Sequence, residues 1–265
     1  MFPLAHNFLV QRLLDNPHYG LSRKLNQMEI NLLRLGSVAP DLVAAMGMDR
    51  NYGHLMGKEL YAYCKEDLPE ALPFAFGVWS HGADPCGFDY YADEHWQDGK
   101  GWCFQKCLPY IDAVVEACNL PPEWGLWKAH NFVEMVAEME CDRVMPDLGS
   151  RLIVAKDDDE ALEIAAKVLT EFGKADYNLI KPVFQTVSDI FTVADVTPDK
   201  LGIKYGEQLI RRHDIYGSHP DQMASIIETI ARDLKDEYWD WYNTVEAMII
   251  KELQSNTDFL QPIGR

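Results

Sequence analysis

Histidine and acidic residues are distributed unevenly along this chain. Six of the eight histidines lie before residue 131, and several have an acidic residue nearby. The clearest pair is His130 and Glu134, four residues apart in a segment with a strong helical pattern. Residues at that spacing share one helix face, so the imidazole and the carboxylate could bind one ion. Because these donors together suit Zn²⁺, the pattern predicts a metal site, and a metallohydrolase is our first hypothesis.

The other candidate ligands precede that pair, and each has an ordinary alternative explanation. Asp41 follows a proline and could cap a helix N-terminus, whereas Asp84 precedes a proline and could end a helix. A single histidine on an apolar helix is usually a core residue. We still expect these side chains to gather, because they occur in ligand-like pairs beside apolar segments. The predicted ligands are His6, Asp41, His54, His81, Asp84, His95, His130 and Glu134.

Helical patterns account for most of the sequence, and alternating strand patterns are scarce. We therefore predict an all-α protein. The composition shifts from apolar to acidic at residues 149–160. This shift suggests a metal-bearing helical core at residues 1–150, with additional helices at residues 151–265 packed on it as one unit. The expected helices cover residues 21–35, which Gly36 would end, and residues 51–66, 73–83, 121–141, 157–172, 198–212 and 218–253.

The composition fits a folded domain and disfavours several functions. Of the 265 residues, 48% are hydrophobic, and no apolar run approaches the roughly 20 residues that span a bilayer. The first residues do not read as a secretion signal, so a cytoplasmic location is expected. The net charge of −18 argues against a nucleic-acid polymer as partner and against adhesion to anionic membranes. It does not exclude an anionic substrate, because clustered metal ions can reverse the local potential.

Motifs of other metalloenzymes are largely missing from the sequence. No histidine has a glutamate three residues before it, which disfavours a di-iron carboxylate bundle, and the zincin motif HExxH is absent. His213-Asp214 is similar to the dipeptide of HD-type phosphohydrolases, but a surface turn explains it better, since no matching upstream histidine pattern accompanies it. The six cysteines form no CxxC motif, so reduced and buried thiols are expected.

The order of the candidate ligands resembles that of one enzyme superfamily. Residues 36–41 read Gly-Ser-Val-Ala-Pro-Asp, which resembles the G-x-x-x-P-D segment of the zinc-dependent phospholipase C and S1/P1 nuclease superfamily. As in that family, a helix with a histidine follows, here with His54. His81 and Asp84 resemble the next His…Asp helix, and residues 130–134 match a late HxxxE motif. His6 is similar to an early histidine, so the likeness covers roughly residues 4–140.

The resemblance implies three neighbouring metal positions and two or three zinc ions. Asp41, His54, His81 and Asp84 would surround the first ion, and Asp84 would bridge to a second ion that His6 also holds. The last ion would be held by His95, His130 and Glu134, and Asp41 would act as general base. The chain departs from the family in its HxxD spacing, where HxxxD is usual, and in having Met1 where secreted members have a processed tryptophan. Asp89 and Asp93 therefore stand as substitutes for Asp84.

The function that follows is metal-dependent hydrolysis of a phosphate ester, with a phospholipid head group or a small phosphodiester as substrate. The alternative is a non-catalytic helical protein with a structural or degenerate metal site, acting through partner binding. In that case the aromatic residues 238–242 could form an interaction surface, although such residues in an amphipathic helix are more often core. A homodimer formed through residues 226–253 would be a related arrangement.

Overall fold

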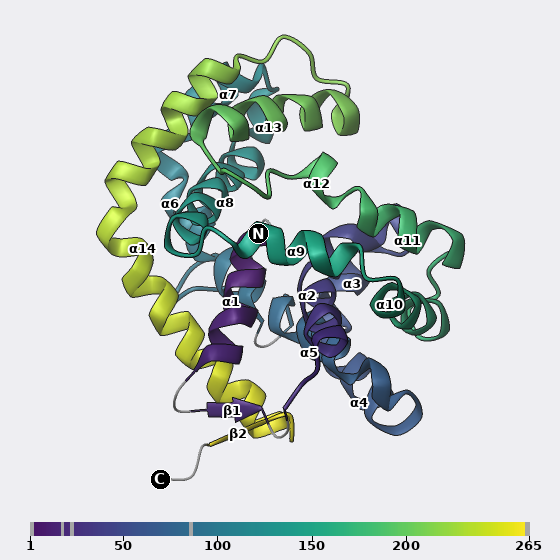
Figure 1. Cartoon of the computed structure of the whole chain (residues 1–265). Coiled ribbons are helices and arrows are strands. Elements are labelled where there is room, and N and C mark those ends of the chain that lie inside the picture. Colours follow the sequence, from purple (N-terminus) through teal and green to yellow (C-terminus); the bar gives the residue numbers. More distant parts are fainter. Residues whose placement is uncertain (1–2, 17–18, 22–23, 85–86, 263–265) are drawn as a thin grey trace.

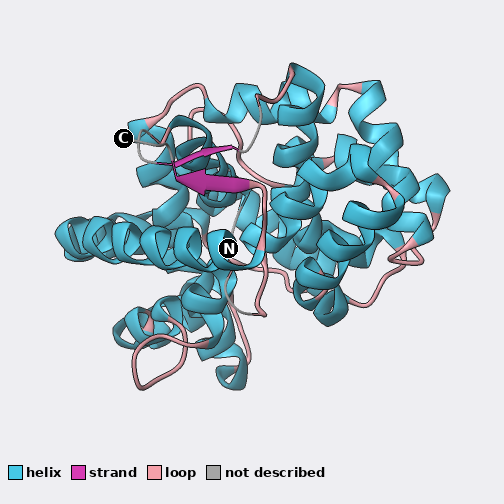
Figure 2. Ribbon diagram, turned by 90° about the horizontal axis from the view of Figure 1, so that it is seen from below, coloured by secondary structure: helices cyan, strands magenta, loops and turns pink. Residues whose placement is uncertain are grey.

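The computed structural model describes residues 3–16, 19–21, 24–84 and 87–262. Over these residues the protein is helical except for loops and one short antiparallel ribbon, in which β1 (Tyr19–Leu21) pairs with β2 (Leu260–Pro262) (Figure 2). The prediction of an all-α protein is therefore confirmed. The α-helices are α1 (Pro3–Asp15), α2 (Gln27–Leu42), α3 (Arg50–Leu55), α4 (Gly57–Asp67), α5 (Leu72–His81), α6 (Trp102–Lys106), α7 (Ile111–Cys118), α8 (Gly125–Val144), α9 (Leu148–Lys156), α10 (Asp159–Glu171), α11 (Tyr177–Gln185), α12 (Val187–Ile190), α13 (Pro198–His213) and α14 (Pro220–Asn256).

Shorter helical turns connect these helices. The 3₁₀ turns are η1 (Val43–Met46), η2 (Pro69–Ala71), η4 (Leu108–Tyr110) and η5 (Pro122–Trp124). A π-helical turn, η3 (Tyr90–Glu94), stands between α5 and α6. Such turns are rare and are frequently found at functional sites.

The helix α14 runs along one flank of the molecule, from α7 and α13 at one end to the β1–β2 ribbon at the other (Figure 1). Its aromatic residues face inward: Tyr238, Trp241 and Tyr242 are buried, and the Trp241 ring stacks on Trp102 with 4.5 Å between centroids. These residues therefore belong to the core. The apolar face of residues 226–253 packs against the rest of the chain, and a homodimer through these residues stays a prediction.

The helices α2 and α5 cross at two glycines, which lets their backbones approach closely. A Cβ atom on Gly36 would lie 2.0 Å from the carbonyl oxygen of Phe74, and one on Gly77 would lie 2.3 Å from that of Leu33. Any larger residue would push the helices apart. This crossing sets the separation between the ends of α2 and α5, where Asp41 and His81 lie.

Two expected helix boundaries are wrong for physical reasons. Gly36 does not end a helix, because α2 starts after the capping box of Asn26 and Glu29 and continues to Leu42, with Gly36 serving the crossing with α5. Residues 51–66 form two helices instead of one, since the chain breaks at Met56. At Gly57 a Cβ would lie 2.6 Å from the Cα of Trp79, so α4 also packs closely on α5.

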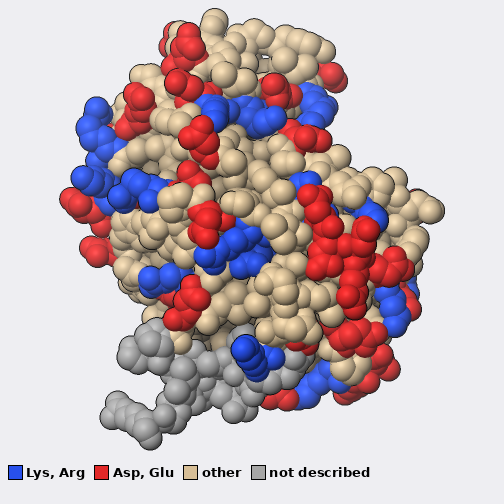
Figure 3. All heavy atoms as spheres, viewed as in Figure 1, with Lys and Arg blue, Asp and Glu red and all other residues tan. Residues whose placement is uncertain are grey.

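Helices from both sides of residue 150 share one buried apolar core, since α9 and α10 pack on α2 and α14 packs on α8. The five cysteines among the described residues are unpaired and buried, as expected; Cys86 lies outside those residues. No described helix combines the length and the apolar character that a membrane crossing requires. Acidic side chains gather on the flank near α10 and α4 in the view of Figure 3.

Candidate metal centre

Histidine and carboxylate side chains from six elements meet in three groups of ligand atoms. Within each group the ligand atoms lie within 4.8 Å of one another. His81 belongs to two groups, so these two adjoin. The first group is His6, His81 and Asp89, the second is Asp41, His54 and His81, and the third is Asp93, His130 and Glu134. Six of the eight predicted ligands are therefore brought together.

The two ring nitrogens of His81 are placed in a way that suits a metal ligand. Its Nδ1 lies 2.7 Å from the carbonyl oxygen of Ser37, to which it donates, and its Nε2 lies 3.1 Å from Oδ2 of Asp89. A neutral imidazole that donates from Nδ1 has a lone pair at Nε2. That lone pair and the carboxylate would repel each other unless a cation or a proton lies between them.

His54 repeats this arrangement on α3. Its Nδ1 lies 2.9 Å from the carbonyl oxygen of Arg50, one turn earlier in the same helix. Its Nε2 lies 3.6 Å from Oδ1 of Asp41 and 3.6 Å from Oδ2 of Asp89. Ligand atoms about 2.1 Å from a tetrahedral zinc ion are about 3.4 Å apart, so these separations fit a shared ion.

His6 completes the first group from α1. Its ring stacks on that of His81 with 3.5 Å between centroids, and its Nε2 lies 3.4 Å from Oδ1 of Asp89. Neither ring nitrogen of His6 has a hydrogen-bond partner, although the side chain is buried. A buried nitrogen without a partner is costly, and coordination of an ion would remove that cost.

The third group joins α8 to the π-helical turn. The Nε2 of His130 lies 3.8 Å from Oε1 of Glu134 on the same helix face, and Asp93 of η3 adds the third ligand. The ring of Phe104 stacks on His130 with 4.1 Å between centroids and fixes its plane. The four-residue spacing therefore places His130 and Glu134 side by side on one helix face, as expected.

Two predicted ligands are placed elsewhere, and two neighbouring acids take their positions. Asp84 is exposed because α5 ends at His81, so the helical spacing behind its assignment does not apply. The chain returns at Asp89, the N-cap of η3, which lies between three of the histidines. His95 is also exposed, beyond the end of η3, and Asp93 lies inward in its place. The assignments of Asp84 and His95 are therefore corrected to Asp89 and Asp93.

Asp41 lies in the last turn of α2, so it is not a helix N-cap. A carboxylate there faces the negative end of the helix dipole, which is unfavourable. Burial raises its pKa, but the neighbouring imidazoles of His54 and His81 help to hold that pKa below the usual value. Its Oδ2 has no hydrogen-bond partner. Because an aspartate at this position destabilises the helix, a role as metal ligand explains Asp41 better than a role as helix cap.

The protonation states favour a cation. Burial lowers the pKa of His6 to about 3 and that of His130 to about 4, so both imidazoles are neutral, which is the ligand form. Burial and the Glu134 carboxylate raise the pKa of Asp93 to about 8. Burial also raises the pKa of Glu134. A divalent ion would stabilise both carboxylates in their charged form.

Glu138 has a supporting role that its sequence position did not reveal. Its carboxyl group accepts from the backbone N–H groups of Leu4, at 2.9 Å, and Ala5, at 2.7 Å. It therefore caps the first turn of α1 and fixes the adjacent His6 relative to α8.

A cavity of about 330 Å³ opens beside the ligand groups. Asp41, Asp93, His130 and Glu134 line its floor. Three cationic side chains, Arg50, Lys128 and Arg212, also line it, together with His213 at the end of α13. Sequence patterns did not identify these cations. His213 contacts Lys128 while Asp214 caps α13 with a φ of 54°, so this pair does not form a motif of the HD type.

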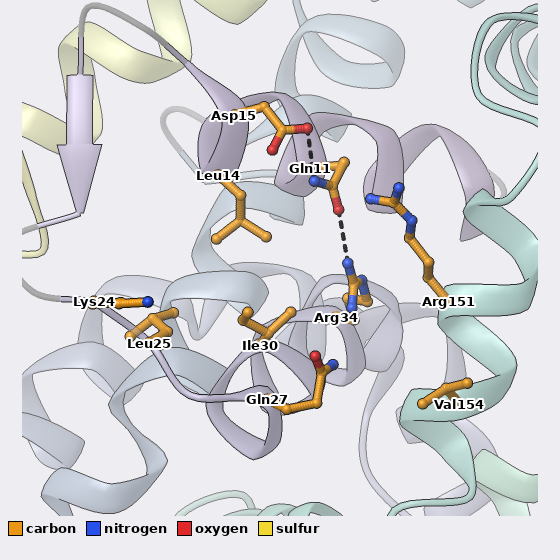
Figure 4. A pocket seen from close by; sticks show the side chains of 10 residues that line it. All are labelled: Gln11, Leu14, Asp15, Lys24, Leu25, Gln27, Ile30, Arg34, Arg151 and Val154. Carbon is orange, nitrogen blue, oxygen red and sulfur yellow. Dashed lines mark hydrogen bonds between the residues drawn. The ribbon is translucent and has the colours of Figure 1, made fainter.

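A second cavity, of about 820 Å³, lies between α1, α2 and α9 and contains none of the ligand groups (Figure 4). At its side the buried Arg34 donates from Nη2 to Oε1 of Gln11 at 2.7 Å. Gln11 in turn donates from Nε2 to Oδ2 of Asp15 at 2.7 Å. Gln11 therefore connects a buried guanidinium to an acidic side chain at the surface.

No family model matches this chain, and neither the curated proteins nor the solved structures gave a significant match.

Proposed function

We propose that this protein is a metal-dependent phosphoesterase that hydrolyses a phosphodiester, with two or three zinc ions held by the three ligand groups. The observation that supports this proposal most directly is the convergence of eight histidine and carboxylate side chains beside a cavity. The donor set of imidazole and carboxylate is one that zinc prefers. The resemblance in ligand order to the zinc-dependent phospholipase C and S1/P1 nuclease superfamily supports the same conclusion, with Asp89 and Asp93 replacing Asp84 and His95.

The residues present fit such ions. Both nitrogens of His6 and the Nε2 of His81 are buried without hydrogen-bond partners, and the Nδ1 donors of His81 and His54 are fixed by backbone carbonyls. Such hydrogen bonds orient metal-binding histidines and select their tautomer. Divalent ions at this site would supply charge to stabilise a phosphate and would lower the pKa of water.

Asp41 is the general base in this proposal. It lines the cavity, and its Oδ2 is available to accept a proton from the water that attacks phosphorus. Its lowered pKa keeps it ionised at neutral pH. The nearby carbonyl of Ser37 and the ring of His81 hold the second ligand group in place while the base acts.

The proposal is tested by metal content and hydrolysis measured on the same preparation. Mass spectrometry of the purified, tag-free protein should give two or three zinc ions per chain, and bis(p-nitrophenyl) phosphate should be cleaved. Chelation should abolish that cleavage and zinc should restore it. Asp41→Asn, measured with saturating zinc, should lower kcat by about 10²–10⁴-fold.

The exposed Asp84 provides a matched control, because Asp84→Asn changes the same functional group outside the ligand groups. An undiminished rate in Asp41→Asn would remove its role as base. A protein that binds no zinc even when it is supplied would instead indicate a non-catalytic helical protein that acts through a partner.

A further inference from the structure

The cations of the cavity are not explained by metal binding. Arg50 begins α3, Lys128 lies on α8, and Arg212 lies in the last turn of α13, so three separate helices direct positive charge at one space. Among the residues that the structure describes, none of the three forms an ion pair with an acidic side chain. In a chain with a net charge of −18, cations without acidic partners are unexpected.

Lys128 is the most constrained of these cations. Its side chain is buried, its Nζ lies 2.7 Å from Nε2 of His213, and it lies 3.7 Å from the centre of the Trp127 ring. Because Arg50, Lys128 and Arg212 line one cavity, their like charges repel one another, and an anion between them would relieve that repulsion.

The carboxylates that line the cavity cannot serve as that anion. All of them, Asp41, Asp93 and Glu134, belong to the ligand groups. Once divalent ions occupy those groups, the negative charge of the carboxylates is compensated. The three cations are then available to bind an anionic group that enters the cavity from solvent.

We propose that the substrate carries a second anionic group, a carboxylate or a phosphate on its head group, which Arg50, Lys128 and Arg212 bind beyond the scissile phosphate. This inference rests on the phosphodiester hydrolysis proposed above and specifies its substrate class. The cavity of about 330 Å³ accommodates a compact head group, with Trp127 and Phe191 as apolar walls. A quaternary ammonium group is disfavoured, because the same cations repel it.

Three p-nitrophenyl phosphodiesters test the substrate class. Their head groups share the same two-carbon stem and differ only in the group at its end, which is a carboxylate, a tert-butyl group or a trimethylammonium group. They derive from 3-hydroxypropanoate, 3,3-dimethylbutanol and choline. With the zinc-loaded protein we expect kcat/KM to fall in that order, by at least about tenfold between the first and the last. An equal rate for all three, or a preference for choline, would overturn the inference while leaving the proposed hydrolysis intact.

Variants assign the selectivity to the cavity. Arg212→Gln and Arg50→Gln should each reduce the ratio of the carboxylate ester to the tert-butyl ester by about tenfold or more, the effect of losing one charged contact. Arg211→Gln is the matched control, because Arg211 is adjacent to Arg212 and exposed like it, but does not line the cavity. If Arg211→Gln changes this ratio as much as Arg212→Gln does, the effect comes from the general electrostatic field. That result would refute a role of Arg212 in binding the anionic group.

A binding measurement separates this inference from the proposed catalysis. Calorimetry with the phosphate monoester of 3-hydroxypropanoate and with phosphocholine does not require turnover. The wild type should bind the first at least about tenfold more tightly, and Arg212→Gln should remove most of this difference. Selective binding without hydrolysis would contradict only the proposed catalysis, whereas hydrolysis without selective binding would contradict only the anionic head group.

Discussion

The Nε2 atom of His81 lies 3.1 Å from Oδ2 of Asp89, although seven residues of chain and the end of a helix separate them. Asp89 also lies within 3.6 Å of His54 and 3.4 Å of His6, so one carboxylate contacts three imidazoles. In the proposed metal centre this carboxylate would be placed to serve both of the first two ligand groups. Its substitution should therefore affect more than one ion.

Asp89→Asn should lower the zinc content by at least one ion per chain, because an amide is a weaker ligand than a carboxylate and cannot bridge ions in the same way. Far-ultraviolet circular dichroism should change little. Zinc per chain, measured by mass spectrometry, checks the loss. Asp84→Asn is the control and should retain the wild-type content; the reverse result would restore Asp84 as the bridging acid.

His130→Ala and Glu134→Ala should each remove one ion, since both ligands of α8 serve the third group. The exposed His95 provides the comparison, and His95→Ala should keep its zinc. Content can be measured after dialysis against a weak chelator. If His95→Ala loses an ion and His130→Ala does not, the third group is wrongly assigned.

Gly36→Ala should destabilise the protein and its metal site together. The new Cβ would lie 2.0 Å from the Phe74 carbonyl oxygen, so α2 and α5 must separate at their crossing. Overpacking of this kind typically costs about 1–3 kcal/mol in the free energy of unfolding, which urea titration measures. Gly99→Ala is a suitable control, because its Cβ would meet only the flexible Gln105 side chain at 3.1 Å. Equal stability of Gly36→Ala and the wild type would rule out the tight crossing.

The buried Glu138 predicts a specific pH dependence for the metal-free protein. Burial raises the pKa of its carboxyl to about 8 from the ordinary value of 4.5. Between these values the folded state keeps a proton that the unfolded chain has released, so this group's contribution to the free energy of unfolding decreases as pH rises. The slope is at most about 1.4 kcal/mol per pH unit.

Glu138→Gln removes that ionisation while keeping an oxygen that can accept from Leu4 and Ala5. In chelated samples between pH 5 and 8, the stability of the wild type should therefore fall relative to this variant as pH rises. Urea midpoints at a series of pH values give the comparison. Parallel curves for the two proteins would show that Glu138 titrates normally.

Gln11→Leu should destabilise the protein by about 1–3 kcal/mol, because it leaves the buried Arg34 without the acceptor shown in Figure 4. Gln222→Leu is the control, since Gln222 is exposed on α14 and its change should stay within about 0.5 kcal/mol. Thermal unfolding of both variants measures the difference. A Gln11→Leu protein as stable as the wild type would mean that water satisfies Arg34.

The parts of the site that lie within one helix were predictable, and the parts that depend on the chain's return were not. His130 and Glu134 follow from helical spacing alone, and the all-α fold follows from periodicity. Asp89 could not be identified by spacing, because the tight return through Gly87, whose Cβ would lie 2.3 Å from the Gly82 nitrogen, brings it back to His81. The sequence therefore offered Asp89 and Asp93 only as substitutes for Asp84, and it did not place Asp93 beside His130 and Glu134.

The cations that line the cavity also could not be predicted from the sequence. Arg50, Lys128 and Arg212 come from three helices distant in sequence, and nothing in their local patterns distinguishes them from ordinary surface residues. Their common position depends on the packing of α13 beside α8. Only the three-dimensional arrangement reveals that they form no ion pair with an acidic side chain in the described part of the chain.

The attachment of α1 to α8 through Glu138 also constrains when the site can form during protein synthesis. His6 leaves the ribosome early, but the carboxylate that anchors its helix is made 132 residues later. At 5–20 residues per second that delay is roughly 7 to 26 seconds. The helix that carries His6 is therefore made long before its anchor on α8, and the third ligand group cannot be complete until His130 and Glu134 have also been made.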